Sequence, residues 1–177
     1  RGLIDDVLEK LGGKTPEADY KLKGGSKGEG WNELLNHSLE PNRKYLVDNR
    51  YLYETDELGR VQRVSGKLEL KSRGRNTYQQ GKSVEIKGGI IGEDEGGHLI
   101  AQIFNGPGEQ INYVPQKAVL NKGAWKMMEK EWIDALKQGK KVHVEIKMVY
   151  DKTKRPELFR VFYEIDGEEI IRTFKNL

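Results

Sequence analysis

The sequence predicts an α+β protein, with a mostly antiparallel sheet and one long helix over about residues 118–138. Three observations predict this. Two strand-like runs, 44–48 and 50–55, flank a turn-favouring asparagine and predict a hairpin. Apolar residues then recur at near-helical spacing from residue 118 onward. Further strand-like runs follow this helix, at 141–150, 158–165 and 169–174.

The N-terminal part has a different pattern. Residues 3–11 have the apolar spacing of a short amphipathic helix, and residues 14–30 are rich in Gly and Lys with little periodicity. We therefore expect an N-terminal helix and flexible arm over 1–43 and one folded domain over 44–177.

The middle of the chain alternates between strands and turns. We expect a strand at 61–70, a basic surface loop at 72–83 and a short buried strand at 98–104. Pro115 is expected just before the long helix, and the pair Asp166-Gly167 suits a tight hairpin turn.

Composition excludes several classes of protein. The 177 residues include no Cys, which excludes disulfides, thiolate zinc sites and Cys nucleophiles. No apolar run is long enough for a membrane helix, and the start lacks the pattern of a signal peptide. Since the chain does not begin with Met, we expect a fragment or a processed C-terminal piece.

The net charge of +3 is distributed unevenly. Residues 60–87 contain eight Lys or Arg against two Glu, and residues 137–160 contain eight against three acids. Such blocks fit a polyanionic partner, although a solvated surface explains them equally well.

The residues that indicate chemistry lie between Gly92 and Trp132. His98 follows two glycines, and an imidazole can accept a proton from water near neutral pH. Asn112 and Asn121 offer amide oxygens, which are hard ligands suited to Mg²⁺. Glu129 follows on the predicted helix and can order metal-bound water.

Three motifs in this order resemble the DNA/RNA non-specific endonucleases, the His–Asn nucleases with a ββα-metal core. They are GGHLIA at 96–101, N-x-V-P-Q at 112–116 and L-N-K-G-A-W-x-x-M-E at 120–129. The most similar branch is the nuclease domain at the C-terminal end of bacterial secreted polymorphic toxins.

The resemblance implies a role for each matched residue. His98 would be the general base, Asn121 the metal ligand and Glu129 the holder of metal-bound water. Asn112 and Gln116 would support the site, and the metal would be Mg²⁺, with Mn²⁺ as an alternative.

Two of these assignments leave alternatives open. Asn121 also suits an N-cap of the long helix, and capping is compatible with metal binding. On a straight helix Glu129 would lie about 12 Å along the axis from Asn121, too far to share one inner metal shell. Either Glu129 acts through water, or the helix is deformed near Gly123.

The chain departs from the family pattern at one position. Many members read D-R-G-H before the base, whereas this chain has Glu95-Gly96-Gly97-His98 and lacks the Arg. A guanidinium is expected elsewhere to stabilise the transition state. Arg75 is the first choice for a catalytic role, and Arg73 and Lys82 follow.

We therefore expect a metal-dependent endonuclease that cuts DNA, and RNA as a second class, with little sequence preference. Lys152 and Lys154 are expected to bind phosphates together with Arg73 and Lys82. A toxin domain of this kind would be secreted, act in the target-cell cytoplasm and be matched by an immunity protein, with no membrane involvement. The rival hypotheses are an inactive nucleic-acid-binding module on the same fold and a plain protein-interaction domain.

Overall fold

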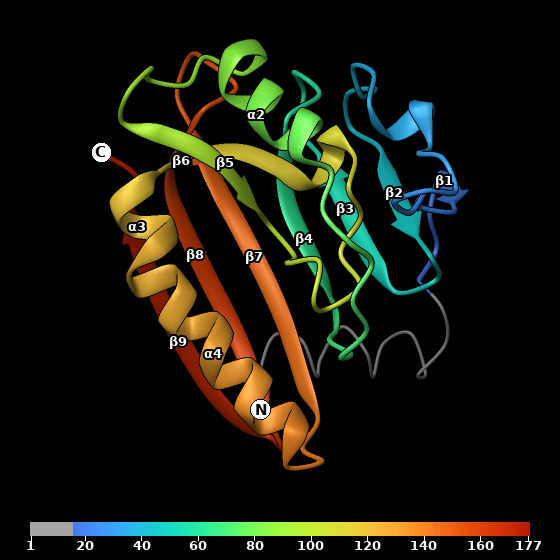
Figure 1. Cartoon of the computed structure of the whole chain (residues 1–177), viewed down its shortest axis with the longest axis vertical. Coiled ribbons are helices and arrows are strands. Elements are labelled where there is room, and N and C mark those ends of the chain that lie inside the picture. The colour runs from blue at the N-terminus through green and yellow to red at the C-terminus, as the bar shows by residue number, and fades with distance from the viewer. Residues whose placement is uncertain (1–15) are drawn as a thin grey trace.

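A computed structural model describes residues 16–177 (Figure 1). The helix expected at residues 3–11 lies outside this range. Seven strands form one sheet in the order β1-β2-β3-β4-β7-β8-β9, and two more, β5 and β6, form a separate pair. The strand bounds are β1 Tyr20–Leu22, β2 Lys44–Val47, β3 Tyr51–Thr55, β4 Val61–Lys67, β5 Asp94–His98, β6 Tyr113–Lys117, β7 Val142–Tyr150, β8 Pro156–Ile165 and β9 Glu168–Lys175.

The predicted hairpins are confirmed. β2 pairs antiparallel with β3, and β8 pairs antiparallel with β9. Their turns place Asp48 at φ 56°, Asn49 at φ 54°, Asp166 at φ 49° and Gly167 at φ 84°. Asn, Asp and Gly tolerate this left-handed backbone, which matches the twist of hairpin strands.

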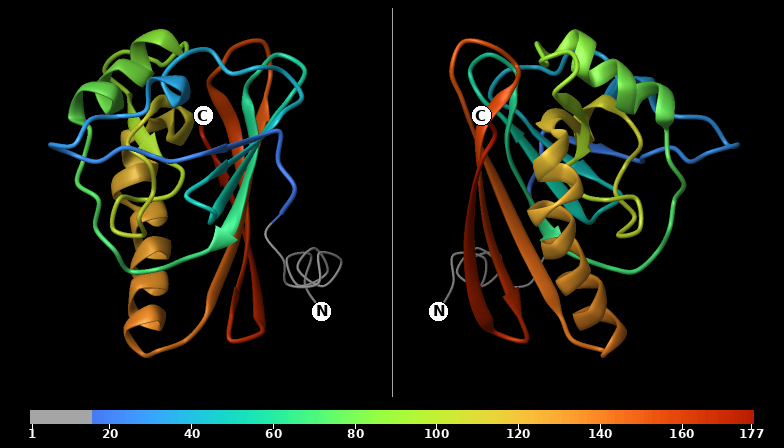
Figure 2. Two further views of the ribbon diagram at one scale, coloured as in Figure 1. Left: turned by 90° about the vertical axis from the view of Figure 1, so that its right-hand side faces the viewer. Right: turned by 60° about the vertical axis from the view of Figure 1, so that its left-hand side comes forward.

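All helices within residues 16–177 and the β5–β6 pair lie on one face of the large sheet (Figure 2). The α-helices are α2 Thr77–Ile86, α3 Ala118–Lys122 and α4 Ala124–Lys137, and two short 3₁₀ turns are η1 Glu33–Leu35 and η2 Gln110–Asn112. None of the described helices is long and apolar enough to cross a membrane.

The long helix α4 is fixed to the sheet by aromatic packing. The Trp125 ring centroid lies 5.1 Å from that of Phe159, and the Trp132 centroid lies 5.4 Å from that of Tyr163. Both tryptophans are 1% exposed, so truncating either to Ala should cost about 3–5 kcal/mol. The core therefore holds the helix that carries Glu129 in a defined position.

The single helix predicted over 118–138 is broken at Gly123. This residue adopts φ −105° and ψ −108°, so α3 ends before it and α4 begins after it. A Cβ at this position would lie 2.6 Å from the Val119 carbonyl oxygen. Glycine permits the break because it has no Cβ.

Two predictions around the first motif were wrong. The basic loop expected at 72–83 contains the start of α2. Asn76 is the N-cap of this helix, and its Oδ1 accepts a hydrogen bond from the Gln79 N–H at 3.2 Å. The strand expected at 98–104 is not formed there. The observed strand, β5, covers Asp94–His98 and ends where the expected strand would begin. The Ile100 N–H and carbonyl bond to the Asn112 side chain, at 2.9 and 2.7 Å, so they are not available for a strand ladder.

Two further elements differ from expectation. Pro115 lies inside β6 opposite Gly96, not at the start of a helix. β6 pairs only with β5, and a proline is tolerated on such an edge strand. In the expected arm, β1 pairs parallel with β2, and Leu35 is fully buried in the core. The division at residue 43 stays a prediction.

Candidate active site

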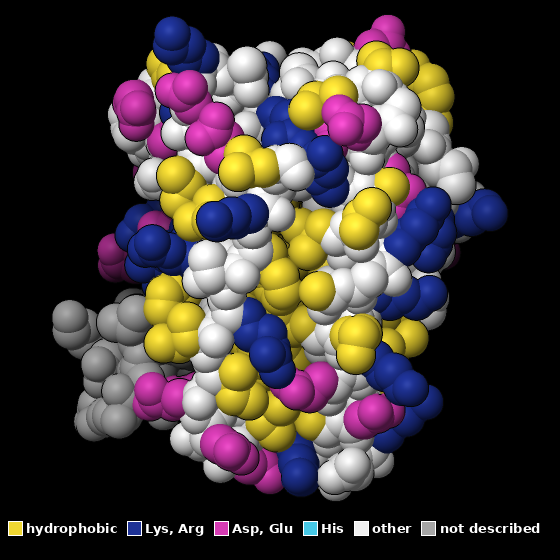
Figure 3. All heavy atoms as spheres, turned by 90° about the vertical axis from the view of Figure 1, so that its left-hand side faces the viewer, with side chains coloured by type: hydrophobic (Ala, Val, Ile, Leu, Met, Phe, Trp, Pro, Cys, Tyr) yellow, Lys and Arg dark blue, Asp and Glu magenta, His cyan; other side chains and the backbone are white. Residues whose placement is uncertain are grey.

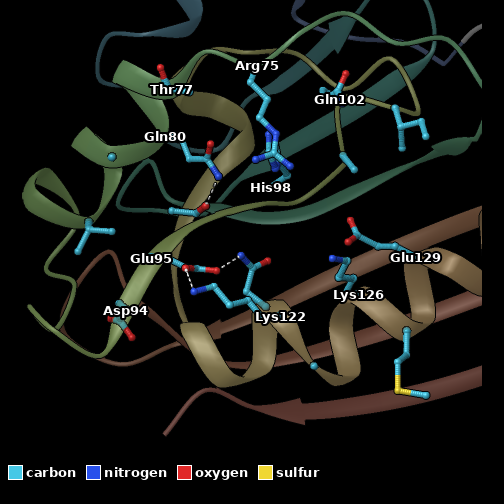
Figure 4. Close-up of a pocket in the computed structure, with 18 of the residues that line it drawn as sticks. Arg75, Thr77, Gln80, Asp94, Glu95, His98, Gln102, Lys122, Lys126 and Glu129 are labelled. Carbon is cyan, nitrogen blue, oxygen red and sulfur yellow. Dashed lines mark hydrogen bonds and ion pairs between the residues drawn. The ribbon is translucent and has the colours of Figure 1, made fainter.

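A cavity of about 1310 Å³ opens between α2, β5 and the two helices α3 and α4. Four predicted residues line it: Arg75, His98, Asn121 and Glu129. Figure 3 shows the face that carries α4, where hydrophobic side chains lie in a hollow and Lys and Arg side chains stand along it. Figure 4 shows the side chains of Arg75, His98, Lys126 and Glu129 around this cavity.

The glycine pair before His98 serves packing. Gly96 and Gly97 are buried residues within β5. A Cβ on Gly96 would lie 1.9 Å from the Gln80 carbonyl oxygen, and one on Gly97 would lie 2.4 Å from Gln116 Oε1. The two glycines therefore let α2 and Gln116 approach the strand that carries His98.

His98 ends β5 and lies under Arg75. Its ring packs against the Tyr113 ring with a centroid distance of 4.8 Å. Its buried Nε2 has no hydrogen-bond partner among residues 16–177. Burial, followed by the charge of Arg75, lowers the pKa of His98 to about 4. The imidazole is therefore neutral near pH 7, which is the form that a general base requires.

Asn121 lies within α3, so the predicted N-cap role was wrong. Its Nδ2 donates a hydrogen bond to Glu95 Oε1 at 2.5 Å, and Lys122 Nζ lies 3.4 Å from Glu95 Oε2. Since the amide nitrogen is turned to Glu95, the amide oxygen points away from that carboxylate and is available as a ligand. From the sequence, Glu95 was only an acidic residue near the missing Arg. The one sequence signal for its contact with Asn121 is its place as the first residue of Glu95-Gly96-Gly97-His98.

Glu129 extends from α4 into the same cavity (Figure 4). Burial raises the pKa of its carboxyl group to about 7, while Arg75 and Lys126 act in the opposite direction. Because the helix is broken at Gly123, Asn121 and Glu129 lie on separate helices. The 12 Å spacing on a straight helix therefore does not apply, and the deformed-helix alternative describes this chain.

Two neighbouring arginines have different surroundings. Arg75 is exposed at the cavity and extends toward His98 (Figure 4), with no ion-pair partner within the described part of the chain. Arg73 is paired with Asp48, donates to Asn105 Oδ1 at 2.9 Å and has a side chain only 7% exposed. The expectation that Arg73 binds nucleic acid is therefore wrong, since its guanidinium is used inside the fold.

Asn112 and Gln116 lie outside the cavity. Asn112 is fully buried and makes four side-chain bonds, to the Tyr53 hydroxyl and to backbone groups of Ile100 and Pro107. Gln116 is 1% exposed and packs beneath Gly97. Both residues therefore hold the backbone next to His98 in position, and neither is placed to contact a substrate.

The remaining predicted basic residues lie away from this cavity. Lys82 stands on another side of α2, and Lys152 and Lys154 are exposed in the loop before β8. Gln80 is a cavity residue that sequence analysis missed. Its Nε2 donates to the Gly96 carbonyl at 2.9 Å, a contact between α2 and β5 that depends on a helix predicted as a loop.

The donors in the cavity fit a lightly ligated divalent ion. No group of three or more His, Asp or Glu side chains able to hold a metal occurs in residues 16–177. A chelating cage is therefore excluded for the described chain. One amide oxygen from Asn121, with water in the other positions, suits Mg²⁺, which retains most of its hydration.

Residues 41–167 match the model of the DNA/RNA non-specific endonuclease family. The chain belongs to this family, since the match spans well over half of its length. It is therefore a nuclease domain, as the motifs around His98 predicted.

Particular relatives refine this assignment. The chain is 36% identical over 159 residues to the type VII secretion system protein EssD of Staphylococcus aureus, in strains USA300 and NCTC 8325 / PS 47. That alignment covers 84% of this chain and 25% of EssD, so the chain spans about a quarter of the length of the curated relatives it matches.

Solved structures confirm the predicted fold class. The chain resembles NucA from Streptococcus agalactiae with magnesium ion bound, at a TM-score of 0.59 and 15% identity, over 80% of this chain and 76% of NucA. The form of NucA with no metal bound gives a TM-score of 0.56 at 17% identity.

Proposed function

We propose that this nuclease domain cleaves DNA, and RNA as a second substrate, in a reaction that requires Mg²⁺ or Mn²⁺. One observation carries the proposal: His98 in its neutral form, Asn121 with its amide nitrogen turned to Glu95, Glu129, and Arg75, which has no ion pair among residues 16–177, line one cavity. The magnesium in the NucA structure supports the choice of metal.

Each side chain has a distinct task in this reaction. Asn121 would hold a magnesium ion, which would supply Lewis-acid stabilisation of the phosphate and of the leaving 3′ oxygen when bound. His98 accepts the proton of the attacking water. Arg75 offers its guanidinium to the negative charge that develops on the phosphate. Glu129 orders water near the ion through its carboxylate.

The inactive-module alternative rested on the arginine missing before His98. The position of Arg75 supports an active enzyme, because its guanidinium, which has no ion pair with another described residue, extends toward the proposed base (Figure 4). A direct test is nicking of supercoiled plasmid with Mg²⁺, with EDTA and with the His98→Ala variant. Of these three reactions, only the wild type with Mg²⁺ is expected to show cleavage. Absence of cleavage by the wild type in every metal tested would contradict the proposal.

The relatives support a place for the domain in a secreted toxin. EssD is named as a protein of the type VII secretion system, and this chain matches a quarter of it. We propose that the domain is exported, acts in the cytoplasm of a target cell and is neutralised in its producer by an immunity protein. Co-expression with the producer's immunity protein should then abolish plasmid cleavage by the purified complex. Full activity of that complex would contradict the immunity proposal.

A further inference from the structure

A second cavity, of about 330 Å³, lies on another side of α2 from the active-site cavity. The two cavities share no lining residue. Gln80, Gly81 and Val84 of α2 face the active site, whereas Lys82 and Ile86 face the second cavity. We call this second space the α2 cavity.

The charged side chains that line the α2 cavity are all basic. They are Arg60, Lys82, Lys87 and Lys154, with His37 beside them and no Asp or Glu among the described lining residues. The active-site cavity, in contrast, includes four acidic residues: Glu85, Asp94, Glu95 and Glu129. A uniformly positive concavity attracts an anion, because its low-dielectric walls focus the field.

The four cations are not equivalent. Arg60 is fixed, since its Nε lies 2.7 Å from Asp56 Oδ2 and its Nη1 donates to the Asp151 and Thr153 carbonyls at 2.8 and 3.1 Å. Lys154 is exposed and has no ion-pair partner in the described chain. Lys82 contacts only Tyr78 among the described residues, with Nζ 3.4 Å from the hydroxyl and 5.4 Å from the ring centroid, and has no ion pair there. Lys82 and Lys154 are therefore free to bind a ligand.

Lys87 is set between these two lysines and the protein interior. Its Nζ donates to the Gln110 and Tyr113 carbonyls, each at 2.6 Å. An ammonium group has three donors, so one N–H remains for the cavity. Burial, and then the charge of Lys154, lowers the pKa of Lys87 to about 7. An anion in the cavity would stabilise the charged form of Lys87.

The remaining wall is mostly apolar. It includes Leu39, Ile86, Ile111, Val114 and the Tyr150 ring. Gln110 also lines the cavity, is 4% exposed and has a buried Oε1 without a partner among the described residues. An apolar wall with one unused acceptor and a basic rim suits a nucleotide unit, with its phosphate at the lysines.

We propose that the α2 cavity is a second phosphate-binding subsite, which holds a backbone phosphate of the same strand that is cut in the active-site cavity. This inference rests on the proposed nuclease function. A helix with its side chains is about 10–12 Å wide, which a duplex strand crosses in about three to four nucleotides at about 3.4 Å each. Tyr78 is 67% exposed on α2 beside Lys82, where a base can stack on its ring.

The test compares two double charge reversals. Lys82→Glu/Lys154→Glu changes the α2 cavity, and Lys21→Glu/Lys23→Glu is the matched control at two exposed residues by the sheet edge, outside both cavities. Binding of a long duplex is measured in EDTA over a salt series. The cavity variant should lose about tenfold or more in affinity, and its log–log salt slope should fall by about two. The control should match the wild type, and circular dichroism should show both variants folded.

Hydrolysis of a small substrate distinguishes a defect in the subsite from a defect in the active site. With Mg²⁺, bis(p-nitrophenyl) phosphate is too short to span α2, so the cavity variant should hydrolyse it at the wild-type rate. Equal losses on the small and long substrates would overturn the subsite, as would unchanged duplex affinity in the cavity variant. A different result would contradict only the proposed nuclease function. In that case the wild-type protein would bind duplex through Lys82 and Lys154 but would never cleave it.

Protection of Lys87 identifies the source of the phosphate. Reductive methylation of Lys87 is followed by mass spectrometry with no ligand, with inorganic phosphate and with the duplex in EDTA. Protection by the duplex, at concentrations where inorganic phosphate has no effect, supports a strand phosphate. Protection by micromolar inorganic phosphate would make the cavity a site for the free ion and would overturn the proposal.

Discussion

Two polar clusters contain the same types of residue and differ in how their hydrogen bonds are used. The active-site cavity holds Arg75, Asn121 and Glu129. The other cluster, which we call the polar brace, consists of Arg73, Glu109 and Asn112, and lies in the protein interior.

In the polar brace, the side chains bond to the protein itself. Glu109 is fully buried, and its Oε2 accepts hydrogen bonds from the Gly25 and Asn32 N–H groups at 3.0 Å each. Asn112 bonds through both ends of its amide. In the cavity, Asn121 bonds only through its nitrogen and Arg75 has no ion pair with a described residue. The brace should therefore contribute stability, and the cavity should contribute binding and catalysis.

The largest expected effect is that of His98→Ala. Removing the proposed base should lower the cleavage rate by about 10²–10⁴-fold with duplex affinity unchanged. His143→Ala is the matched control, because His143 lies on β7, outside both cavities. Single-turnover cleavage in Mg²⁺ measures both, and a wild-type rate for His98→Ala would end the His-base mechanism.

The next largest difference is expected between the Arg75→Ala and Arg73→Ala variants. Arg75→Ala should reduce the single-turnover rate by roughly 10²-fold with a smaller loss of binding, because transition-state charge is stabilised more than ground-state charge. Arg73→Ala should instead lower the melting temperature, since it removes the ion pair with Asp48 and the hydrogen bond to Asn105 Oδ1. Similar kinetic losses in both variants, with equal stability, would remove the distinction between the clusters.

A smaller effect is expected on stability at low pH. The pKa of His98 is about 4 in the fold, below the ordinary value of 6.5, because of burial and then Arg75. The unfolded chain therefore binds a proton that the folded chain excludes, and this contribution to stability is lost as the pH falls from 6.5 toward 4. In EDTA, the drop in melting temperature between pH 7.5 and pH 5 should be smaller in His98→Ala than in the wild type. An equal drop would contradict the buried, neutral imidazole.

Much of the fold could be predicted because it depends on local patterns. Alternation predicts β7, where Val142, Val144 and Ile146 are buried, and turn chemistry predicts both hairpins. The end of β5 could not be predicted in this way. It depends on Asn112, whose side chain bonds to Ile100 twelve residues earlier in the chain.

The site was predictable in its residue types and less so in its geometry. His98, Asn121 and Glu129 were found from the motifs and lie in one cavity. The choice between Arg73 and Arg75 depends on Asp48, which lies 25 residues before Arg73, so composition could not make it. Likewise, the role of Glu95 depends on its contact with Asn121, 26 residues away.

The two asparagines test the distinction between the clusters most directly, since one substitution can be made in each. Asn112→Ala leaves buried groups of Tyr53, Ile100 and Pro107 without partners, which should cost about 3–5 kcal/mol and lower the melting temperature by roughly 10 °C. Asn121→Ala removes no cap and should leave the melting temperature of the metal-free protein within about 2 °C of the wild type.

The decisive measurement is a Mg²⁺ titration of single-turnover cleavage for both variants, at a temperature where both are folded. Asn121→Ala should need about 10–100-fold more Mg²⁺ and cut more slowly, as expected for a lost metal contact. Asn112→Ala should keep the wild-type Mg²⁺ midpoint despite its lower stability. An unchanged midpoint in Asn121→Ala, or a shifted midpoint in Asn112→Ala alone, would contradict the assignment of the metal to the cavity.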